Sequence, residues 1–383
     1  MTTCVSHDPA ILNLPLYDNG HRALAERLED WCGSRMSDWE RDSDRDPAER
    51  CRALMAELGD AGWLAHLDGG GEASDMRSVC VRRQTLAYHE DLSDLTYSIQ
   101  ELAAIAVARY GTAEQRGRYL PGMSDGSVVA AVALSEEGAG SDLGAVALRA
   151  EPSHDGYVLN GVKTWIALGD IADMCVVLAR TGDGPGPLGL SAFLVDMHAT
   201  GVTRGAIEAI APRSWAELTF TDCHVGTGAL LGERGQGFVV ALEMLERFRM
   251  TVAAAAVGFG RRAYRLALDR ARGREAFGGR LADLQLVKSS LTSMDVRLSA
   301  AALLTARAAL ALDTGGEYAK DSAVAKLYAT ESAGQVVDAA VQVFGAAGVV
   351  SGTAIERLYR QVRALRIYEG SSELLAMTIA ESL

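Results

Sequence analysis

The distribution of proline constrains the fold of this chain most strongly. The last proline is Pro212, and none occurs in residues 213–383. Because a proline inside a helix costs about 3 kcal/mol, a long proline-free segment suits long helices. Apolar spacing in this segment predicts helices over residues 238–272, 283–312 and 318–344. Each such helix must bury an apolar stripe against a partner, so we expect a helical bundle domain over 234–383.

The chain before this segment shows two different sequence patterns. Residues 1–127 show helical spacing, and Thr112 with Gln115 forms the pattern of a capped helix start. Residues 128–233 carry short apolar runs bounded by Gly, Asp and Pro, which predict strands in a small barrel or sandwich. No alternation of strands and helices suggests a dinucleotide-binding Rossmann domain. The helices predicted in the first part cover 23–31, 48–58, 82–92 and 97–110, and the strands cover 128–134, 156–159, 174–179, 191–195 and 217–222.

Charge and cysteine usage exclude several classes of function. The net charge of −13 argues against a nucleic-acid partner and against broad contact with anionic lipid. No run approaches the roughly 18 apolar residues of a membrane span, and residues 1–30 lack the pattern of a signal peptide. The six cysteines form no CxxC pair and have no metal-ligand spacing with histidine. We expect a cytoplasmic protein with reduced thiols and no metal site.

Four segments could carry chemistry, and the first is residues 133–142, Ala-Leu-Ser-Glu-Glu-Gly-Ala-Gly-Ser-Asp. Its small residues follow a predicted strand, and successive backbone N–H groups in such a turn can hold an anion such as a pyrophosphate. Ser135 and Ser141 add hydroxyl groups. An ordinary surface turn explains the same composition equally well.

The second and third segments are also ambiguous by themselves. Asn160-Gly161 is a hairpin signal, and Trp165 beyond it offers a flat ring that could lie beside an aromatic cofactor. A lone tryptophan is more often part of a core. Arg274, in the segment before Gly278, could bind a phosphate through two hydrogen bonds. A solvated arginine before a helix-ending glycine is the simpler reading.

The fourth segment is residues 366–373, Arg-Ile-Tyr-Glu-Gly-Ser-Ser-Glu. Glu369 lies between two predicted helices, and Ser371 or Ser372 could cap the second one. A carboxylate held near apolar neighbours has a raised pKa and can accept a carbon-bound proton. A capping or surface glutamate is the alternative. Arginines recur every third residue from 357 to 366, which is typical of a solvated helix face and could also dock a phosphate or a carrier.

Taken together, these segments resemble the acyl-CoA dehydrogenase family of flavoproteins over nearly the whole chain. Residues 133–145 fit the family's first signature at every fixed position. Residues 110–121 and 231–238 resemble the segments before and after the middle domain. Gln342-x-x-Gly345 and the segment Ile367-Tyr-Glu-Gly370 match the C-terminal signature. Five matches in the right order carry the resemblance.

The resemblance implies a mainly α fold with a middle β-barrel. Its parts would be an N-terminal helical domain over 1–127, the barrel over 128–233 and a C-terminal four-helix bundle over 234–383. It also implies non-covalent FAD with its flavin between barrel and bundle, and a homodimer or homotetramer in which a second subunit reaches FAD. The implied FAD-binding residues are Leu134, Ser135, Ser141, Trp165, Ile166, Ala167, Arg274, Phe277, Gln285, Gln342, Gly345, Ala346, Ser371 and Glu373.

The resemblance further implies α,β-dehydrogenation of an acyl thioester. Glu369 would remove the α-proton while the β-hydrogen leaves as hydride to flavin N5, and the backbone N–H of Glu369 would polarise the thioester carbonyl. Some family members carry the base at the position of Phe248, which cannot accept a proton. An electron-transfer flavoprotein is the implied electron acceptor. The implied substrate-binding residues are Ser141, Glu246, Arg249 and Gly370.

Three departures from the family pattern limit what can be carried over. Ala167 replaces a Ser or Thr that bonds the flavin in many members, and Ala346 replaces the second glycine of its segment. Residues 67–71, Leu-Asp-Gly-Gly-Gly, differ from the usual Tyr-Gly-Gly segment. The substrate could therefore be an acyl-CoA or a carrier-protein thioester in a biosynthetic pathway. A flavin oxidase or monooxygenase on the same fold is the alternative activity, and a non-catalytic scaffold is a third reading.

Overall fold

The computed structural model describes residues 5–68, 75–182, 184 and 186–383. Residues 69–71 of the divergent glycine-rich segment therefore lie outside the described residues. The chain divides into two compact units, each assembled from separate stretches of sequence. Unit 1 comprises Met1–Arg41, Asp75–Asp94 and Glu246–Leu383, and unit 2 comprises Asp42–Ser74 and Leu95–Leu245.

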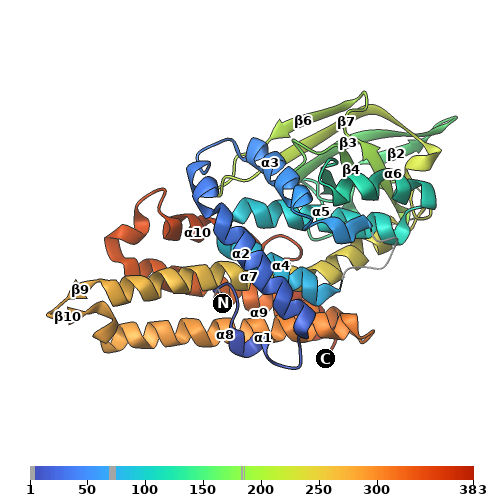
Figure 1. Ribbon diagram of the computed structural model, residues 1–383. Helices are drawn as coiled ribbons and strands as arrows, with labels where there is room; N and C mark the ends of the chain where they lie inside the picture. Colours follow the sequence, from blue (N-terminus) through green and yellow to red (C-terminus); the bar gives the residue numbers. More distant parts are fainter. Residues whose placement is uncertain (1–4, 69–74, 183, 185) are drawn as a thin grey trace. The chain divides into compact units, whose positions relative to one another are not determined.

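Unit 1 is helical and contains the long helices of the proline-free segment. Helices α8 and α9 pack against each other, and α10 and α11 also pack on α9 (Figure 1). A Cβ built on Gly260 of α7 would meet Leu298 Cδ2 of α8 at 2.5 Å, so glycine permits this close approach. The helices of unit 1 are α1 (Pro9–Leu12), α2 (Asn19–Arg41), α4 (Met76–His89), α8 (Gln285–Asp313), α9 (Ala319–Phe344), α10 (Ala354–Val362), α11 (Ser372–Glu381) and the larger part of α7 (Gly237–Gly273).

The three long helices expected after Pro212 are confirmed as α7, α8 and α9, with ends that shift by at most two residues. The prediction over 82–92 is wrong at its C-terminal end. Helix α4 ends at His89, and α5 (Asp91–Tyr110) begins directly after Glu90. Glu90 adopts an extended conformation (φ −150°, ψ 118°), and its carboxylate accepts a hydrogen bond from Leu92 N at 3.1 Å. The glutamate therefore separates the two helices and caps the second one.

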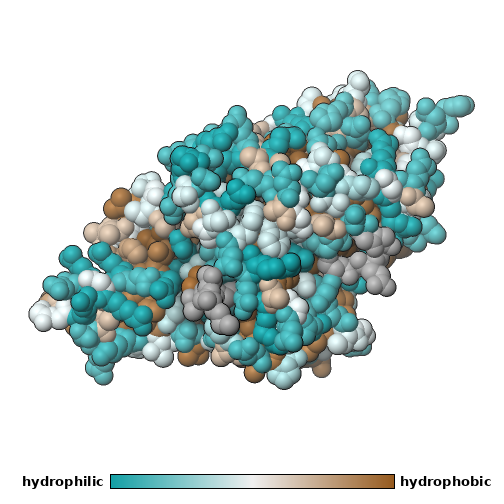
Figure 2. Space-filling view, viewed as in Figure 1, coloured by the Kyte–Doolittle hydropathy of each residue, from teal (hydrophilic) through white to brown (hydrophobic). Residues whose placement is uncertain are grey.

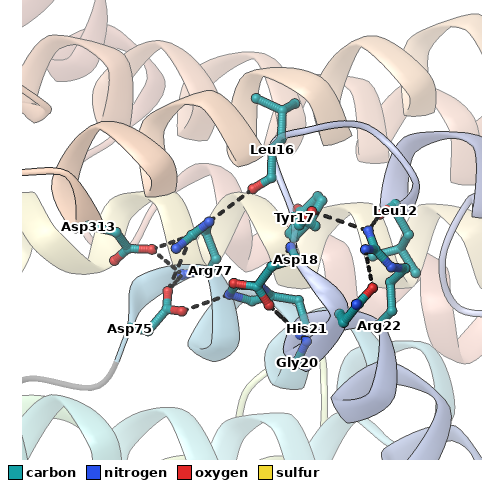
Figure 3. Close-up of polar contacts among 11 residues, drawn as sticks. Leu12, Leu16, Tyr17, Asp18, Gly20, His21, Arg22, Asp75, Arg77 and Asp313 are labelled. Carbon is teal, nitrogen blue, oxygen red and sulfur yellow. Dashed lines mark hydrogen bonds and ion pairs between the residues drawn. The ribbon is translucent and has the colours of Figure 1, made fainter.

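A polar cluster holds the start of α4 within unit 1 (Figure 3). Asp75 bonds His21 Nε2 of α2 at 2.7 Å, while Arg77 Nε lies 2.7 Å from Asp313 Oδ2 at the end of α8. Asp313 also accepts a bond from Met76 N. Burial, the largest cause, and the hydrogen bond to Asp75 raise the pKa of Asp313 to about 6. Burial is also the largest cause at Asp75 and raises its pKa, but the hydrogen bonds to His21 and Asp313 and the charges of His21 and Arg77 together lower it. These contacts join three helices that are distant in sequence.

Unit 2 combines helices with the β-sheet. Its helices are α3 (Pro47–Asp60), α6 (Ala113–Ser124) and most of α5. The predicted capping box is confirmed, because Gln115 N donates to Thr112 Oγ1 at 3.2 Å and Thr112 N donates to Gln115 Oε1 at 2.8 Å.

Short 3-10 helices occur in both units. They are η1 (Ala65–Asp68), η2 (Leu143–Ala145), η3 (Gly186–Gly189), η4 (Thr227–Ala229), η5 (Leu281–Asp283), η6 (Gly345–Val349) and η7 (Arg363–Arg366).

The sheet of unit 2 has eight strands in the order β6-β7-β3-β2-β4-β5-β8, with β1 paired in parallel to β4. Its buried core includes Ala131, Leu159, Phe193 and Phe220. A closed barrel is not shown by this pairing, because β6 and β8 end the path within the described residues. The strands are β1 (Ala130–Ala133), β2 (Arg149–Pro152), β3 (Gly156–Ala167), β4 (Met174–Arg180), β5 (Leu190–Asp196), β6 (Val202–Ala206), β7 (Trp215–Gly226) and β8 (Leu230–Leu231).

The hairpin predicted at Asn160-Gly161 is wrong, because both residues lie inside the single long strand β3. The pairing of β3 with β7 shifts register between Leu159 and Gly161, which marks a bulge. A Cβ on Gly161 would lie 2.9 Å from Leu148 Cα, so the glycine serves a close backbone approach. Asn160 instead exchanges hydrogen bonds with Asp222 of β7.

The surface visible in Figure 2 is mostly hydrophilic, consistent with the charge of −13. Across the described ranges, no helix is long and apolar enough to cross a membrane. In the same part of the chain, no group of three or more His, Cys, Asp and Glu side chains is arranged to hold a metal ion. The cysteines that the structure describes are buried and free of disulfides.

Candidate active site

Glu369 lies in the turn between η7 and α11 in unit 1. Its φ of 53° and the φ of 94° at Gly370 both fall in the left-handed region. This region is uncommon for residues other than glycine and stores about 1–3 kcal/mol of strain, and such strain clusters at functional sites. Ser371 Oγ accepts a hydrogen bond from Leu374 N at 3.3 Å, which confirms the predicted cap on α11.

The carboxyl group of Glu369 has a buried oxygen without a partner. Its Oε2 atom has no hydrogen bond from any described residue. Burial raises the pKa of Glu369, and Asp94 adds to the rise. The positive charges of Arg83, Lys326 and Arg249 oppose it. A carboxylate with a raised pKa and a free oxygen can accept a proton from a bound ligand.

Helix α7 places Arg249 beside this turn. A Cβ built on Gly370 would lie 3.8 Å from Arg249 Nε, so the two residues are neighbours. Arg249 is buried, its Nε has no partner among the described residues, and burial lowers the pKa of the guanidinium. Phe248 beside it is fully buried, and Glu246 accepts a bond from Ser322 Oγ through its carbonyl oxygen. The structure thus brings together Glu369, Gly370 and Arg249.

A buried ion pair near Glu369 was not anticipated. Arg83 of α4 bonds Asp94 through Nε and Nη2, both at 2.9 Å, and donates from Nη1 to Thr251 Oγ1 at 2.9 Å. All three residues are buried: Arg83 is 2% exposed, Asp94 3% and Thr251 0%. The available signal was one charged residue in each of two successive helices, Arg83 in α4 and Asp94 in α5. Helical spacing alone does not separate buried from solvated charges.

Lys326 of α9 was also missed. Its side chain is fully buried, and its Nζ lies 2.6 Å from the carbonyl oxygen of Gly370. Burial lowers the pKa of Lys326 to about 8, although Glu369 acts in the opposite direction. Lys326 and Gly370 are far apart in sequence, so spacing could not reveal this contact.

In unit 2, the first signature segment is held against β3. Lys163 of β3 lies 2.8 Å from Glu136 Oε1 and donates to Leu134 O at 2.9 Å, while Thr164 N donates to Ser135 O at 3.0 Å. Burial lowers the pKa of Lys163 to about 8. At Glu136 burial is the largest cause and raises the pKa, but the hydrogen bond and charge of Lys163, with the backbone donors Ala147 and Leu148, together lower it. These contacts fix the backbone at two of the predicted cofactor-binding residues, Leu134 and Ser135.

Trp165 is presented outward from this region rather than packed in the core. It lies at a second irregularity of β3, has φ 62° and is 58% exposed, whereas Ile166 and Ala167 are buried. The core-tryptophan reading is therefore wrong. In the adjoining turn, a Cβ at Gly138 or Gly140 would meet no atom within 4 Å, and Ser141 is exposed. An exposed indole next to an open, glycine-containing turn fits the ring and phosphates of FAD.

The remaining predicted FAD residues lie on the surface of unit 1. Strands β9 (Glu275–Ala276) and β10 (Gly279–Arg280) form a hairpin between α7 and α8 (Figure 1). Phe277 at its tip has φ 53° and is 93% exposed. The end of α7 that leads into the hairpin is near the end of α9, since the Arg270 guanidinium lies 5.6 Å from the Phe344 ring centre. The other exposed residues of this group are Arg274, Gln285, Gln342, Gly345 and Ala346.

Two details of this group bear on the departures noted in the sequence. Gly345 has φ 62° and ψ −141°, a conformation that suits glycine. Ala346 is not at positive φ, so its methyl group causes no backbone strain. Glu373 is exposed in the first turn of α11, where its own backbone N–H and the Ser371 hydroxyl lower its pKa. Glu373 therefore makes local capping contacts in this structure.

Comparison with known proteins gives a consistent result over the whole chain. Three domain models of one family match in order: the acyl-CoA dehydrogenase N-terminal domain over residues 18–127, the middle domain over 131–223 and the C-terminal domain over 235–383. The last of these covers the turn with Glu369.

Individual relatives agree with this match. The 3-(aryl)acrylate reductase of Clostridium sporogenes (strain ATCC 15579) is 35% identical over 333 residues, which cover 86% of this chain and 88% of the relative. The mitochondrial short-chain specific acyl-CoA dehydrogenase of Homo sapiens is 38% identical over 280 residues, covering 72% and 68%. Neither is named as an oxidase or monooxygenase, and the comparisons do not favour that alternative.

A solved structure extends the agreement to the fold and the cofactor. The structure titled "PigA with FAD and proline" superposes with a TM-score of 0.88 at 26% identity, covering 95% of this chain and 97% of the other. Three observations therefore support FAD as the cofactor: the match in fold, the exposed side chain of Trp165 and the open space around the glycines of the neighbouring turn. The chain belongs to the acyl-CoA dehydrogenase family, whose members are FAD-dependent oxidoreductases acting on the CH–CH bond of acyl thioesters.

Proposed function

We propose that Glu369 is the base that removes the α-proton of the acyl thioester. The observation that carries this proposal is the buried, unpartnered Oε2 of a glutamate held at φ 53°. The pKa of Glu369 is raised toward neutral pH, and a base whose pKa lies nearer the working pH is better suited to general-base catalysis. Phe248, at the other family position for a base, is apolar and fully buried.

The residues around Glu369 would orient the thioester. The backbone N–H of Glu369 would donate to the thioester carbonyl oxygen, and one such donor is typically worth about 2.7–4 kcal/mol. Arg249 offers a buried guanidinium with an unpartnered Nε next to Gly370. Glu246 and Ser141 complete the proposed substrate-binding set.

The proposed FAD contacts follow the resemblance to the acyl-CoA dehydrogenase family. When bound, FAD supplies the flavin ring that accepts the hydride. Trp165, Ile166 and Ala167 would flank that ring, and Leu134, Ser135 and Ser141 would contact the flavin and its phosphates. The remaining proposed contacts are Arg274, Phe277, Gln285, Gln342, Gly345, Ala346, Ser371 and Glu373.

A homodimer or homotetramer is part of the proposal. Phe277 and Leu286 are 93% and 84% exposed, and large apolar side chains in such positions favour a protein contact. We propose that a second copy covers them and receives FAD contacts from this hairpin. The division into domains at 1–127, 128–233 and 234–383, closure of the sheet into a barrel and a cytoplasmic location belong to the same proposal.

The substrate is an acyl-CoA or an acyl-carrier-protein thioester, with an electron-transfer flavoprotein as the proposed acceptor. One relative is named a reductase and the other a dehydrogenase, so the direction in the cell is a separate question. A biosynthetic carrier-protein substrate is the finer proposal, because residues 67–71, Ala167 and Ala346 depart from the family pattern.

The test is anaerobic mixing of the FAD-loaded protein with a panel of acyl-CoA and acyl-carrier thioesters. Flavin bleaching without oxygen or an added reductase is the expected result, and the thioester that bleaches fastest identifies the substrate class. Glu369→Gln should slow bleaching by about 10²–10⁴-fold, the usual range for a general base. The matched control Glu381→Gln removes an exposed carboxylate from the end of α11 and should bleach normally. Near-normal bleaching in Glu369→Gln would exclude Glu369 as the base.

A further inference from the structure

The turn that carries Glu369 is fastened to α9 at more than one point. At its edges, Arg366 Nε donates to Glu331 Oε1 at 2.7 Å, and Ser372 Oγ donates to the same oxygen at 2.6 Å. Between these anchors, Lys326 Nζ donates to Gly370 O at 2.6 Å. The anchors at Glu331 hold the ends of the turn, and Lys326 bonds the carbonyl oxygen of its central residue, Gly370.

The position of Lys326 requires an explanation because a buried ammonium group is costly unless it is paired. No carboxylate forms an ion pair with it among the described residues, and its direct partners there are backbone. The charges that act on it from a greater distance are Glu369, Arg249, Glu331 and Glu373. A buried ammonium group with a neutral carbonyl as its partner is a poor source of stability, so another role has to account for it.

The location of the acceptor suggests what the lysine does. Gly370 O belongs to the residue directly after Glu369, and both residues have left-handed φ values of 94° and 53°. A donor on this carbonyl fixes the plane of the peptide that follows, and with it the left-handed turn that directs the Glu369 side chain. The positive charge of Lys326 also favours the ionised form of Glu369, as do Arg83 and Arg249, whereas Asp94 opposes it.

We propose that Lys326 is a positioning residue for the base, holding the Glu369–Gly370 turn through the Gly370 carbonyl. The inference rests on the proposed role of Glu369 and assigns it a support on α9. Lys326 itself touches neither the thioester nor the proton in this scheme. Its contribution is to keep the carboxylate in one place and in its ionised form.

Lys326→Met tests this assignment, because methionine keeps the volume of the chain and removes the ammonium group. The anchors at Glu331 remain, so the variant should fold and retain FAD. Misplacement of a reacting group by about 1 Å can cost 10²-fold. We expect the rate of anaerobic flavin bleaching to fall by roughly 10- to 100-fold at saturating thioester, with a smaller change in the half-saturating concentration.

The pH profile separates positioning from a loss of packing. Without the Lys326 charge, the pKa of Glu369 should rise, so the acidic limb of the bleaching rate should move to higher pH. Lys326→Arg, which keeps a cationic donor, should recover part of the rate and restore the limb. Thr330→Val is the matched structural control: Thr330 is buried on the same helix, and its hydroxyl donates to the backbone oxygen of Lys326 at 2.9 Å. It should leave rate and profile unchanged.

The outcomes distinguish this inference from the base assignment. A Lys326→Met protein with normal rate and an unmoved acidic limb overturns the positioning role, while slow bleaching in Glu369→Gln would still support the base. Normal bleaching in Glu369→Gln overturns the base itself. If Lys326→Met does not fold, Lys326→Gln, which removes the charge, decides: a folded variant with a normal bleaching rate and an unmoved acidic limb overturns the proposal.

Discussion

Two buried lysines, one in each unit, illustrate different uses of the same side chain. Lys163 and Lys326 are both fully buried, and burial lowers the pKa of each to about 8. Lys163 lies 2.8 Å from the carboxylate of Glu136, whereas Lys326 bonds the neutral carbonyl of Gly370. The first lysine is paired with a charge, and the second is not.

This difference predicts where each lysine matters. Removing one member of a buried ion pair leaves the other charge without compensation, which is strongly destabilising. Removing a donor from a carbonyl leaves only an unsatisfied polar group. We therefore expect Lys163 to act mainly on the stability of unit 2, and Lys326 to act mainly on the geometry of the turn around Glu369.

The largest expected effect is that of Lys163→Met. It should lower the free energy of unfolding by about 3–5 kcal/mol, because the Glu136 carboxylate would lose its charged partner and keep the backbone donors Ala147 N and Leu148 N. Lys326→Met should cost about 1–3 kcal/mol. Denaturant unfolding and the flavin absorbance per protein measure both losses. Lys288→Met, at an exposed site on α8, is the control and should change little. Equal losses of stability in Lys163→Met and Lys326→Met would contradict the expected difference between the two lysines.

A smaller effect is expected from Gly370→Ala, which tests the acceptor side of the Lys326 contact. The substitution forces alanine into φ 94° and brings its methyl group to 3.2 Å from Leu375 Cδ2. We expect a loss of about 1–3 kcal/mol in stability and slower flavin bleaching. Gly315→Ala is a matched control, with φ 73° and no atom within 4 Å of the added Cβ. If both variants bleach flavin at the normal rate, the geometry of the Gly370 carbonyl is not important for catalysis.

The pH dependence of stability sharpens the comparison further. Lys326 has a pKa of about 8 in the folded protein against an ordinary value of 10.5. Between these values the unfolded chain binds the proton and the folded chain does not, so this group makes the free energy of unfolding rise with pH. Lys326→Met should flatten that rise by up to about 1.4 kcal/mol per pH unit. Unfolding curves from pH 8 to 10 measure it, and parallel trends in wild type and variant would contradict the assignment.

The smallest expected effect is that of Ser371→Ala. It removes the side-chain acceptor from the N-terminus of α11, which should cost about 1 kcal/mol. The cap lies at the edge of the turn, beyond the peptide that Lys326 holds. Bleaching should therefore slow less than in Lys326→Met, as measured in the same anaerobic assay. A larger loss of rate in Ser371→Ala than in Lys326→Met would show that the cap on α11 supports the turn more than the contact with α9 does.

Local rules in the sequence predicted much of this fold. The absence of proline after Pro212 and the apolar spacing located α7, α8 and α9, and the Thr112–Gln115 pattern located the start of α6. These rules work because they depend on residues within one or two turns. They failed at Asn160-Gly161, where a close approach to Leu148 overrides the usual turn preference.

The candidate site divides in the same way. Glu369 and Arg249 were proposed from the resemblance to the acyl-CoA dehydrogenase family, because the segment around Glu369 alone also suits a capping or surface glutamate. Lys326, Arg83 and Asp94 were not, because their partners lie far away in sequence or depend on burial. No spacing rule separates a lysine that reaches a distant carbonyl from one that is solvated.

The fastening of residues 366–372 to α9 has a consequence for protein engineering. Glu331 fixes both edges of the turn, and Lys326 fixes its middle. The turn and the stretch of α9 from 326 to 331 therefore form a pair that must be grafted together into another helical scaffold. Transplanting the glutamate-containing loop alone would transfer its sequence without the template that shapes it.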